Sequence, residues 1–133
     1  MLTVKVFSFS YIYTGIPEDT SGNGGGFVFD CRFIYNPGRK DEFKHLTGKD
    51  EDVIEFLDNN QEMQQFVILS SEIVESAIDN YISRDFTDLM VSFGCTGGQH
   101  RSVYAAEKLA SMLENIYDGS ISIEVHHNDL PAL

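Results

Sequence analysis

The segment VSFGCTGGQHRSVY, residues 91–104, passes from an apolar run through a glycine-rich loop into helix-like sequence. The apolar part, LMVSFG at residues 89–94, is uninterrupted, as in a strand that is covered on both faces. Beyond the loop, apolar residues recur at three- and four-residue intervals, which predicts an amphipathic helix that begins near Arg101 or Ser102. Open α/β sheets bind ligands where a loop of this kind follows a strand, so the segment predicts both a fold class and a site.

The rest of the chain alternates between strand-like and helix-like patterns. The further strands predicted are residues 2–9, 27–33 and 121–125, and the further helical faces are residues 53–57 and 63–81, separated near Asn59 and Asn60. Strands separated by helices favour parallel pairing. We therefore expect one α/β domain over residues 1–133. It has a mostly parallel or mixed four-stranded sheet flanked by helices, with a phosphate-binding loop between the third strand and the last helix.

The charge of the chain favours a small ligand over a polymer. The formal net charge is −12, from 21 acidic and 9 basic residues, and such a surface repels nucleic acid and anionic lipid. Several basic residues nevertheless fall in one segment, and if the fold brings them together with Arg101 they make a local positive pocket that suits a small anion. They are Arg32, Arg39, Lys40, Lys44 and Lys49.

Cysteine usage and the apolar pattern indicate a location inside the cell. The two cysteines, Cys31 and Cys95, form no spaced disulfide framework, which favours a reducing compartment. The amino-terminal residues alternate like a strand and lack the features of a signal peptide, and no apolar run is long enough to span a bilayer. We expect a soluble, cytoplasmic protein with no membrane contact.

The loop after the third strand combines the groups that hold a tetrahedral anion. Glycines can turn backbone N–H groups toward an anion, and the following helix adds the positive end of its dipole. An arginine offers a planar fork to phosphate, and hydroxyl groups donate further hydrogen bonds. The plainer alternative is a glycine-rich turn with a surface arginine. The candidate ligand residues in this loop are Cys95, Thr96, Gly97, Gly98, Gln99, His100, Arg101 and Ser102.

The spacing from Cys95 to Arg101 leaves a catalytic hypothesis open. Cys, five residues, Arg and then Ser resembles the signature loop of the protein tyrosine phosphatases and the low-molecular-weight phosphatases. A helix amino end beside an arginine favours the thiolate that attack on phosphorus requires. The leaving group also needs an acid, and nothing in the sequence selects among Asp30, Asp85 and Asp88. The alternative for Cys95 is a small buried residue at a strand end.

Asp30 and Arg32 are a second candidate contribution to the site. Separated by two positions, they would share one face of the second strand and either pair with each other or line the ligand site. The histidines have no spacing typical of zinc ligands, and neighbouring His126 and His127 would point to opposite faces of a strand. We expect neither a metal nor another cofactor.

Three segments resemble the carboxy-terminal domain of the RapZ (RNase adapter protein) family. They are FVFDCRFIYNP, HLTGKD and, most specifically, GCTGGQHRSVYAAEKLA, and the opening FSFSYIYTGIP is similar to that domain's start. Full-length members carry an amino-terminal P-loop kinase-like domain, which marks a nucleotide-binding family. The chain has no Walker-type motif, so we expect a stand-alone copy of the second domain.

The resemblance implies a regulatory domain whose pocket holds a phosphorylated amino sugar, glucosamine-6-phosphate, and in some members an adapter that presents RNA to a ribonuclease. The residues of this chain that match the family's pocket motifs are Asp30, Arg32, Cys95, Thr96, Gly97, Gly98, His100 and Arg101. Two departures stand out: Gly38 replaces a family histidine, and no basic residue follows Lys108, which disfavours RNA. Our first hypothesis is non-catalytic sensing of a sugar phosphate, and the alternatives are a phosphatase that uses Cys95 and Arg101 and an RNA-binding adapter. A protein partner or homo-oligomer stays open.

Overall fold

The structure is a computed structural model that describes residues 1–23 and 25–131. Gly24, in the glycine cluster, and residues 132–133, in the tail, lie outside the described residues. The elements are β1 (Thr3–Ser10), β2 (Gly26–Asp30), η1 (Pro37–Arg39), η2 (Asp41–Phe43), α1 (Glu51–Asp58), α2 (Gln61–Ser83), β3 (Asp88–Cys95), α3 (Arg101–Tyr117) and β4 (Ser122–His127). One α/β domain is therefore confirmed, with four strands in the order β2-β3-β1-β4 and every pair parallel.

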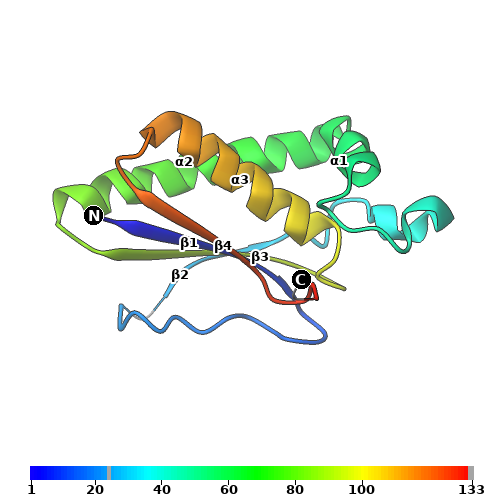
Figure 1. Cartoon of the computed structure of the whole chain (residues 1–133), viewed down its shortest axis with the longest axis horizontal. Helices are drawn as coiled ribbons and strands as arrows, with labels where there is room; N and C mark the ends of the chain where they lie inside the picture. Colours follow the sequence, from blue (N-terminus) through cyan, green and yellow to red (C-terminus); the bar gives the residue numbers. More distant parts are fainter. Residues whose placement is uncertain (24, 132–133) are drawn as a thin grey trace.

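The three α-helices cover one face of the sheet, and the segment between β1 and β2 runs beneath the other face (Figure 1). Alternate residues of β1, such as Val4 and Val6, are fully buried and belong to the same core cluster as residues of all three helices. Phe29, Phe66 and Phe93 carry this core to the β2 edge through ring contacts. None of the helices in the described part of the chain is long and apolar enough to cross a membrane.

The predicted break between the first two helices is confirmed at Asn59 and Asn60. The side chain of Asn60 accepts a hydrogen bond from the N–H of Met63 at 2.8 Å and so caps the start of α2. The predicted start of the last helix at Arg101 is confirmed as well. These signals are local, which explains why the sequence alone located them.

The predicted second strand, residues 27–33, was too long at its carboxyl end. β2 stops at Asp30 because the carboxylate of Asp30 accepts a hydrogen bond from the N–H of Arg32 at 2.9 Å and turns the chain there. Arg32 therefore lies beyond the strand, and the prediction that Asp30 and Arg32 share a strand face is wrong. The two side chains still meet, as described below.

The strand order brings the candidate loop to a switch point in the topology. β1 and β3 are neighbours at the centre of the sheet, and the chain leaves β1 toward β2 but leaves β3 toward β4. Open α/β sheets bind ligands outside the carboxyl ends of their strands. The loop after β3 lies at this position.

Candidate functional site

The loop Thr96–His100 joins β3 to α3, and its backbone amides are free of protein acceptors. Among the described residues, no oxygen accepts a hydrogen bond from the N–H groups of Thr96 through Val103, and the first bonded amide is that of Tyr104, which donates to His100 O at 3.0 Å. Gly98 has φ +69°, and an added Cβ at Gly97 would meet nothing within 4 Å. The loop thus presents N–H donors beside open space at the amino end of a helix.

Arg101 is buried at the base of this loop, so the alternative of a surface arginine is wrong. Its side chain is 4% exposed, and Nη1 donates to the carbonyl oxygens of Arg32 at 2.9 Å and Ile34 at 2.8 Å. Its Nε is buried and has no hydrogen-bond partner among the described residues. No described carboxylate forms an ion pair with it. Its charge therefore stands without a neutralising acid beside the free amides.

Cys95 lies at the end of β3 and packs against the start of α3. Its side chain is 2% exposed, and its Sγ lies 3.1 Å from the hydroxyl of Ser102, which is fully buried. Of the three acids weighed for a phosphatase, Asp85 and Asp88 lie at the opposite end of β3. An eight-residue strand places that end roughly 25 Å from the loop. Neither residue can protonate a leaving group there.

Asp30 and Arg32 form an exposed ion pair near the loop. The guanidinium of Arg32 donates from Nη2 to Asp30 Oδ2 at 2.7 Å and lies 3.8 Å from the ring centroid of Tyr11. The hydrogen bond from Arg32 is the main cause that lowers the pKa of Asp30, and Arg101 adds a smaller attraction. The pair covers the end of β2, and Asp30 is ionised, which also makes it a poor general acid.

Gln99 and His100 hold neighbouring segments against the loop. Gln99 Nε2 donates to Asp129 O at 2.6 Å, and Gln99 O accepts from Gly48 N at 2.8 Å. His100 Nε2 lies 2.9 Å from Phe43 O. Because a carbonyl oxygen only accepts, Nε2 must carry the hydrogen in this contact.

Gly38, the departure from the family pattern, lies against His100. A Cβ built at Gly38 would come within 2.9 Å of His100 Cε1 and 3.0 Å of Nδ1. A side chain at this position would therefore displace the imidazole or move the turn. The absence of a side chain at Gly38 therefore leaves room for the imidazole of His100 at its observed position.

Asp129 is a site residue that the sequence analysis missed. Its Oδ2 accepts from Ser10 N at 2.7 Å and from Thr14 Oγ1 at 2.7 Å, and a Cβ at Gly98 would come within 2.9 Å of its Cβ. Asp129 follows β4 closely, as Ser10 ends β1, so the rule that carboxyl ends of parallel strands share one edge was the signal that could have found it. Ser10 adds a link to the loop, since its Oγ donates to Thr96 O at 2.6 Å.

Arg32, Lys40 and Lys49 do not share the single positive pocket that the sequence left open. Arg32 pairs with Asp30, whereas Lys40 lies 5.3 Å from the ring centroid of Phe56 on α1. Lys49 lies instead with Lys108 in a small pocket on α3. Arg101 is the basic residue of this set that is buried at the base of the loop.

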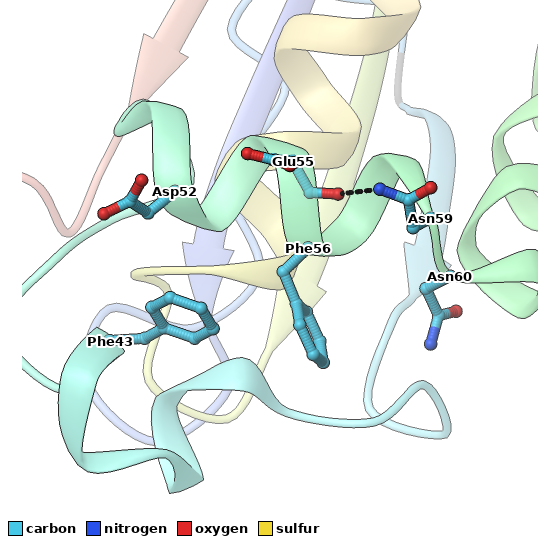
Figure 2. Close-up of a pocket in the computed structure, with 6 residues that line it drawn as sticks. All are labelled: Phe43, Asp52, Glu55, Phe56, Asn59 and Asn60. Carbon is cyan, nitrogen blue, oxygen red and sulfur yellow. Dashed lines mark hydrogen bonds between the residues drawn. The ribbon is translucent and has the colours of Figure 1, made fainter.

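A separate cavity of about 520 Å³ lies between η2 and α1, and its chemistry does not suit an anion. Figure 2 shows that Phe43 and Phe56 project into it, while Asp52 and Glu55 supply carboxylates along the helix; its remaining lining residues are Asn59 and Asn60. Two carboxylates repel phosphate.

The residues that the structure describes contain no group of three or more histidine, cysteine, aspartate or glutamate side chains placed to hold a metal ion. His126 stacks on Phe7 with ring centroids 5.0 Å apart. The neighbouring His127 instead places Nδ1 2.6 Å from Ser8 Oγ. The two imidazoles point to opposite faces of β4, as the strand period predicts.

Comparison with known proteins identifies the family. Similar curated proteins, each named a nucleotide-binding protein, occur in Endomicrobium trichonymphae (36% identical over 129 residues), Fervidobacterium nodosum (40% over 127 residues) and Thermotoga neapolitana (36% over 127 residues). The alignments cover 96–97% of this chain but 42% of each relative, so the chain spans less than half the length of these proteins. The family model described as the RapZ C-terminal domain matches residues 2–131, and the chain belongs to this family.

Proposed function

We propose that this chain is a regulatory domain that binds a phosphorylated metabolite, of the glucosamine-6-phosphate type, in the loop from Cys95 to Ser102. The observation that carries the proposal is the run of N–H groups from Thr96 through Val103 without protein acceptors. Backbone donors that the protein leaves unpaired, at a helix amino end, are matched to the oxygens of a phosphate. Membership of the RapZ C-terminal domain family supports the assignment.

The charge around the loop supports a phosphate over a neutral sugar. Arg101 contributes a buried positive charge that no described acid neutralises, and its Nε has no partner among the described residues. A doubly charged phosphate gains from that field, whereas an uncharged sugar gains only hydrogen bonds. Asp129 lies against Gly98, and its carboxylate could bind an amino group of the same ligand.

Binding without turnover is the form of the proposal that fits the arrangement. The thiol of Cys95 is buried and lies beside the Ser102 hydroxyl, and the acids Asp85 and Asp88 are at the far end of β3. A thiol phosphatase needs an accessible sulfur and an acid near the leaving group.

Isothermal titration calorimetry with four ligands tests the proposal. We expect glucosamine-6-phosphate to bind more tightly than inorganic phosphate and glucosamine to bind very weakly. A nucleoside monophosphate tests the chemistry that the relatives' names suggest. The Gly97→Ala variant places a methyl group in open space beside the amides and should lose binding while it stays folded. Equal heats for glucosamine and its phosphate, or unchanged binding by the variant, would contradict the proposal.

The adapter part of the proposal concerns a protein partner and not RNA. At a net charge of −12, RNA binding would have to overcome repulsion over most of the surface. We expect no RNA binding above about 100 mM salt, where the phosphate-contact contribution falls steeply. A gel-shift titration at low and moderate salt measures this directly, and a salt-dependent complex would favour the RNA alternative.

A further inference from the structure

Cys31 and Cys95 lie opposite each other across the β2–β3 pair. The register ends with Asp30 opposite Gly94, and Cys31 N donates to Gly94 O at 2.8 Å, which continues the parallel ladder by one residue. This places Cys31 opposite Cys95. Neighbouring strands are about 4.8 Å apart, and disulfides join Cα atoms about 4.4–6.8 Å apart. The backbone spacing therefore suits a disulfide.

The two side chains also project from the same face of the sheet. Phe29 stacks on Phe93 with ring centroids 5.4 Å apart, and each cysteine follows its phenylalanine by two positions. Residues two apart on a strand share a face, so the two thiols lie on the same face of the sheet as the stacked rings. Both thiols are free and buried, and both belong to one core cluster.

From this geometry we infer that Cys31 and Cys95 are a covalent modification site, at which a small peroxide oxidises the pair to an intramolecular disulfide. In the first step the sulfur of Cys95 attacks a peroxide oxygen, the O–O bond breaks, and a sulfenic acid and water form. In the second step the sulfur of Cys31 attacks that of Cys95, the S–O bond breaks, and a second water leaves. Two thiols and one hydrogen peroxide thus give one disulfide and two waters.

The surroundings of the two sulfurs fix the order of the steps. Cys95 is 2% exposed, directly precedes the exposed Thr96 and has its Sγ 3.1 Å from the Ser102 hydroxyl, so it is the sulfur nearer to the surface of the loop. Cys31 is fully buried. Burial, followed by the nearness of Cys95, raises the pKa of the Cys31 thiol, which makes it a slow first target. Proximity then makes it the resolving thiol.

The turn after β2 supplies the small movement that the bond requires. Cys31 lies just beyond the last residue of β2, in the turn that Asp30 initiates, so its backbone is not bound on both sides by a ladder. The inference does not depend on which ligand the loop binds, because the modification is read from the protein's own mass.

Peroxide treatment of the reduced, folded chain tests the inference. We expect both thiols to disappear together, the intact mass to fall by two hydrogen atoms, and dithiothreitol to reverse both changes. Peptide mapping should find the peptides of Cys31 and Cys95 joined. The Cys31→Ala variant should leave a sulfenic acid on Cys95 that dimedone traps, and Cys95→Ala should leave Cys31 a thiol.

Circular dichroism establishes that each variant is folded, and the wild-type peptide map decides the question if one is not. Three results would overturn the inference: a disulfide between two chains, oxidation of Cys95 to the sulfinic acid with Cys31 unchanged, or no reaction of the folded protein with millimolar peroxide.

Discussion

Two glycine-rich loops follow the carboxyl ends of the two central strands. They differ in whether an aspartate of the loop accepts hydrogen bonds from their backbone amides. In the β1–β2 loop, Asp19 accepts hydrogen bonds from Ser21 N at 3.0 Å and Gly25 N at 2.9 Å, and Ser21 Oγ accepts from Asn23 N at 3.2 Å. In the β3–α3 loop, the amides from Thr96 through Val103 find no acceptor among the described residues. Both loops contain glycines, but only in the first does an aspartate of the loop itself bind backbone amides.

The difference lies in the residues between the glycines. An aspartate two to six positions before an amide folds back and binds it, as Asp19 does. The β3–α3 loop has no acid between Cys95 and Ser102, and a buried arginine follows its glycines. The proposed anion site thus combines glycines that have no carboxylate within their own loop with an arginine that forms no ion pair with a described acid. The predictions below test this contrast.

The largest effect is expected from Arg101→Ala. It removes the buried positive charge at the base of the β3–α3 loop and leaves the carbonyl oxygens of Arg32 and Ile34 without their Nη1 donor. We expect the free energy of unfolding to fall by about 3 kcal/mol. We also expect phosphate binding to fall below detection. Urea unfolding and calorimetry measure the two quantities. Arg39→Ala, which removes the same charge from an exposed position, should change neither. Equal effects of both variants would contradict the contrast between the loops.

Substitutions at the two adjacent glycines should affect folding stability and ligand binding differently. Gly98 has φ +69° and a would-be Cβ 2.9 Å from the Cβ of Asp129, so Gly98→Ala should destabilise the fold. The expected loss is about 1–2 kcal/mol. Gly97→Ala should leave stability within about 0.5 kcal/mol and still abolish binding. Thermal unfolding with and without glucosamine-6-phosphate measures both effects, and binding by Gly97→Ala at the wild-type affinity would show that the amides do not face the ligand.

A smaller effect is expected from Asp19→Ala in the β1–β2 loop. The change removes the acceptor of Ser21 N and Gly25 N and should cost about 1 kcal/mol of stability. Ligand affinity at the other loop should stay the same. Differential scanning calorimetry and ligand titration of the same sample provide the comparison. Loss of affinity in this variant would mean that the two loops act as one site.

The smallest effect is expected from Asp30→Asn, and it depends on pH. The hydrogen bond from Arg32 lowers the pKa of Asp30, so the folded state binds fewer protons than the unfolded state and the pair stabilises the fold above the unfolded pKa. That stabilisation is lost as the pH falls from about 4 through the lowered pKa. Urea unfolding should therefore show a small difference between wild type and variant near pH 7 that disappears in acid. A difference between wild type and variant in the free energy of unfolding that grows as the pH falls would contradict this prediction.

The elements of the fold were predictable where their signals are local. The apolar run of β3, the helical spacing of α3 and the break between helices at Asn59 and Asn60 each occupy a few neighbouring residues, and the structure confirms all three. The carboxyl end of β2 was not predictable from apolar content, since the turn depends on one hydrogen bond from Arg32 N to Asp30 that competes with strand formation.

The candidate site was predictable in its residue types but not in its contacts. The loop residues are consecutive, so the sequence displays them together. The hydrogen bonds from Arg101 to Arg32 O and Ile34 O join positions 67 and 69 residues apart, and backbone carbonyls carry no signature in the sequence. Asp129 reaches Ser10 across 119 residues. Such contacts follow from the strand order, which residue patterns alone left undetermined.

Because all strands run in one direction, Met1 and the β3–α3 loop lie at opposite ends of the molecule (Figure 1). β1 starts at Thr3 and reaches the loop only at Ser10, which corresponds to roughly 25 Å of extended chain. A biotin or tag attached at the amino end therefore sits far from the β3–α3 loop, whereas an attachment at Pro131 begins two residues after Asp129, which lies against Gly98 of that loop. On a biosensor chip, immobilisation through the amino end is the orientation that leaves the β3–α3 loop open to the analyte.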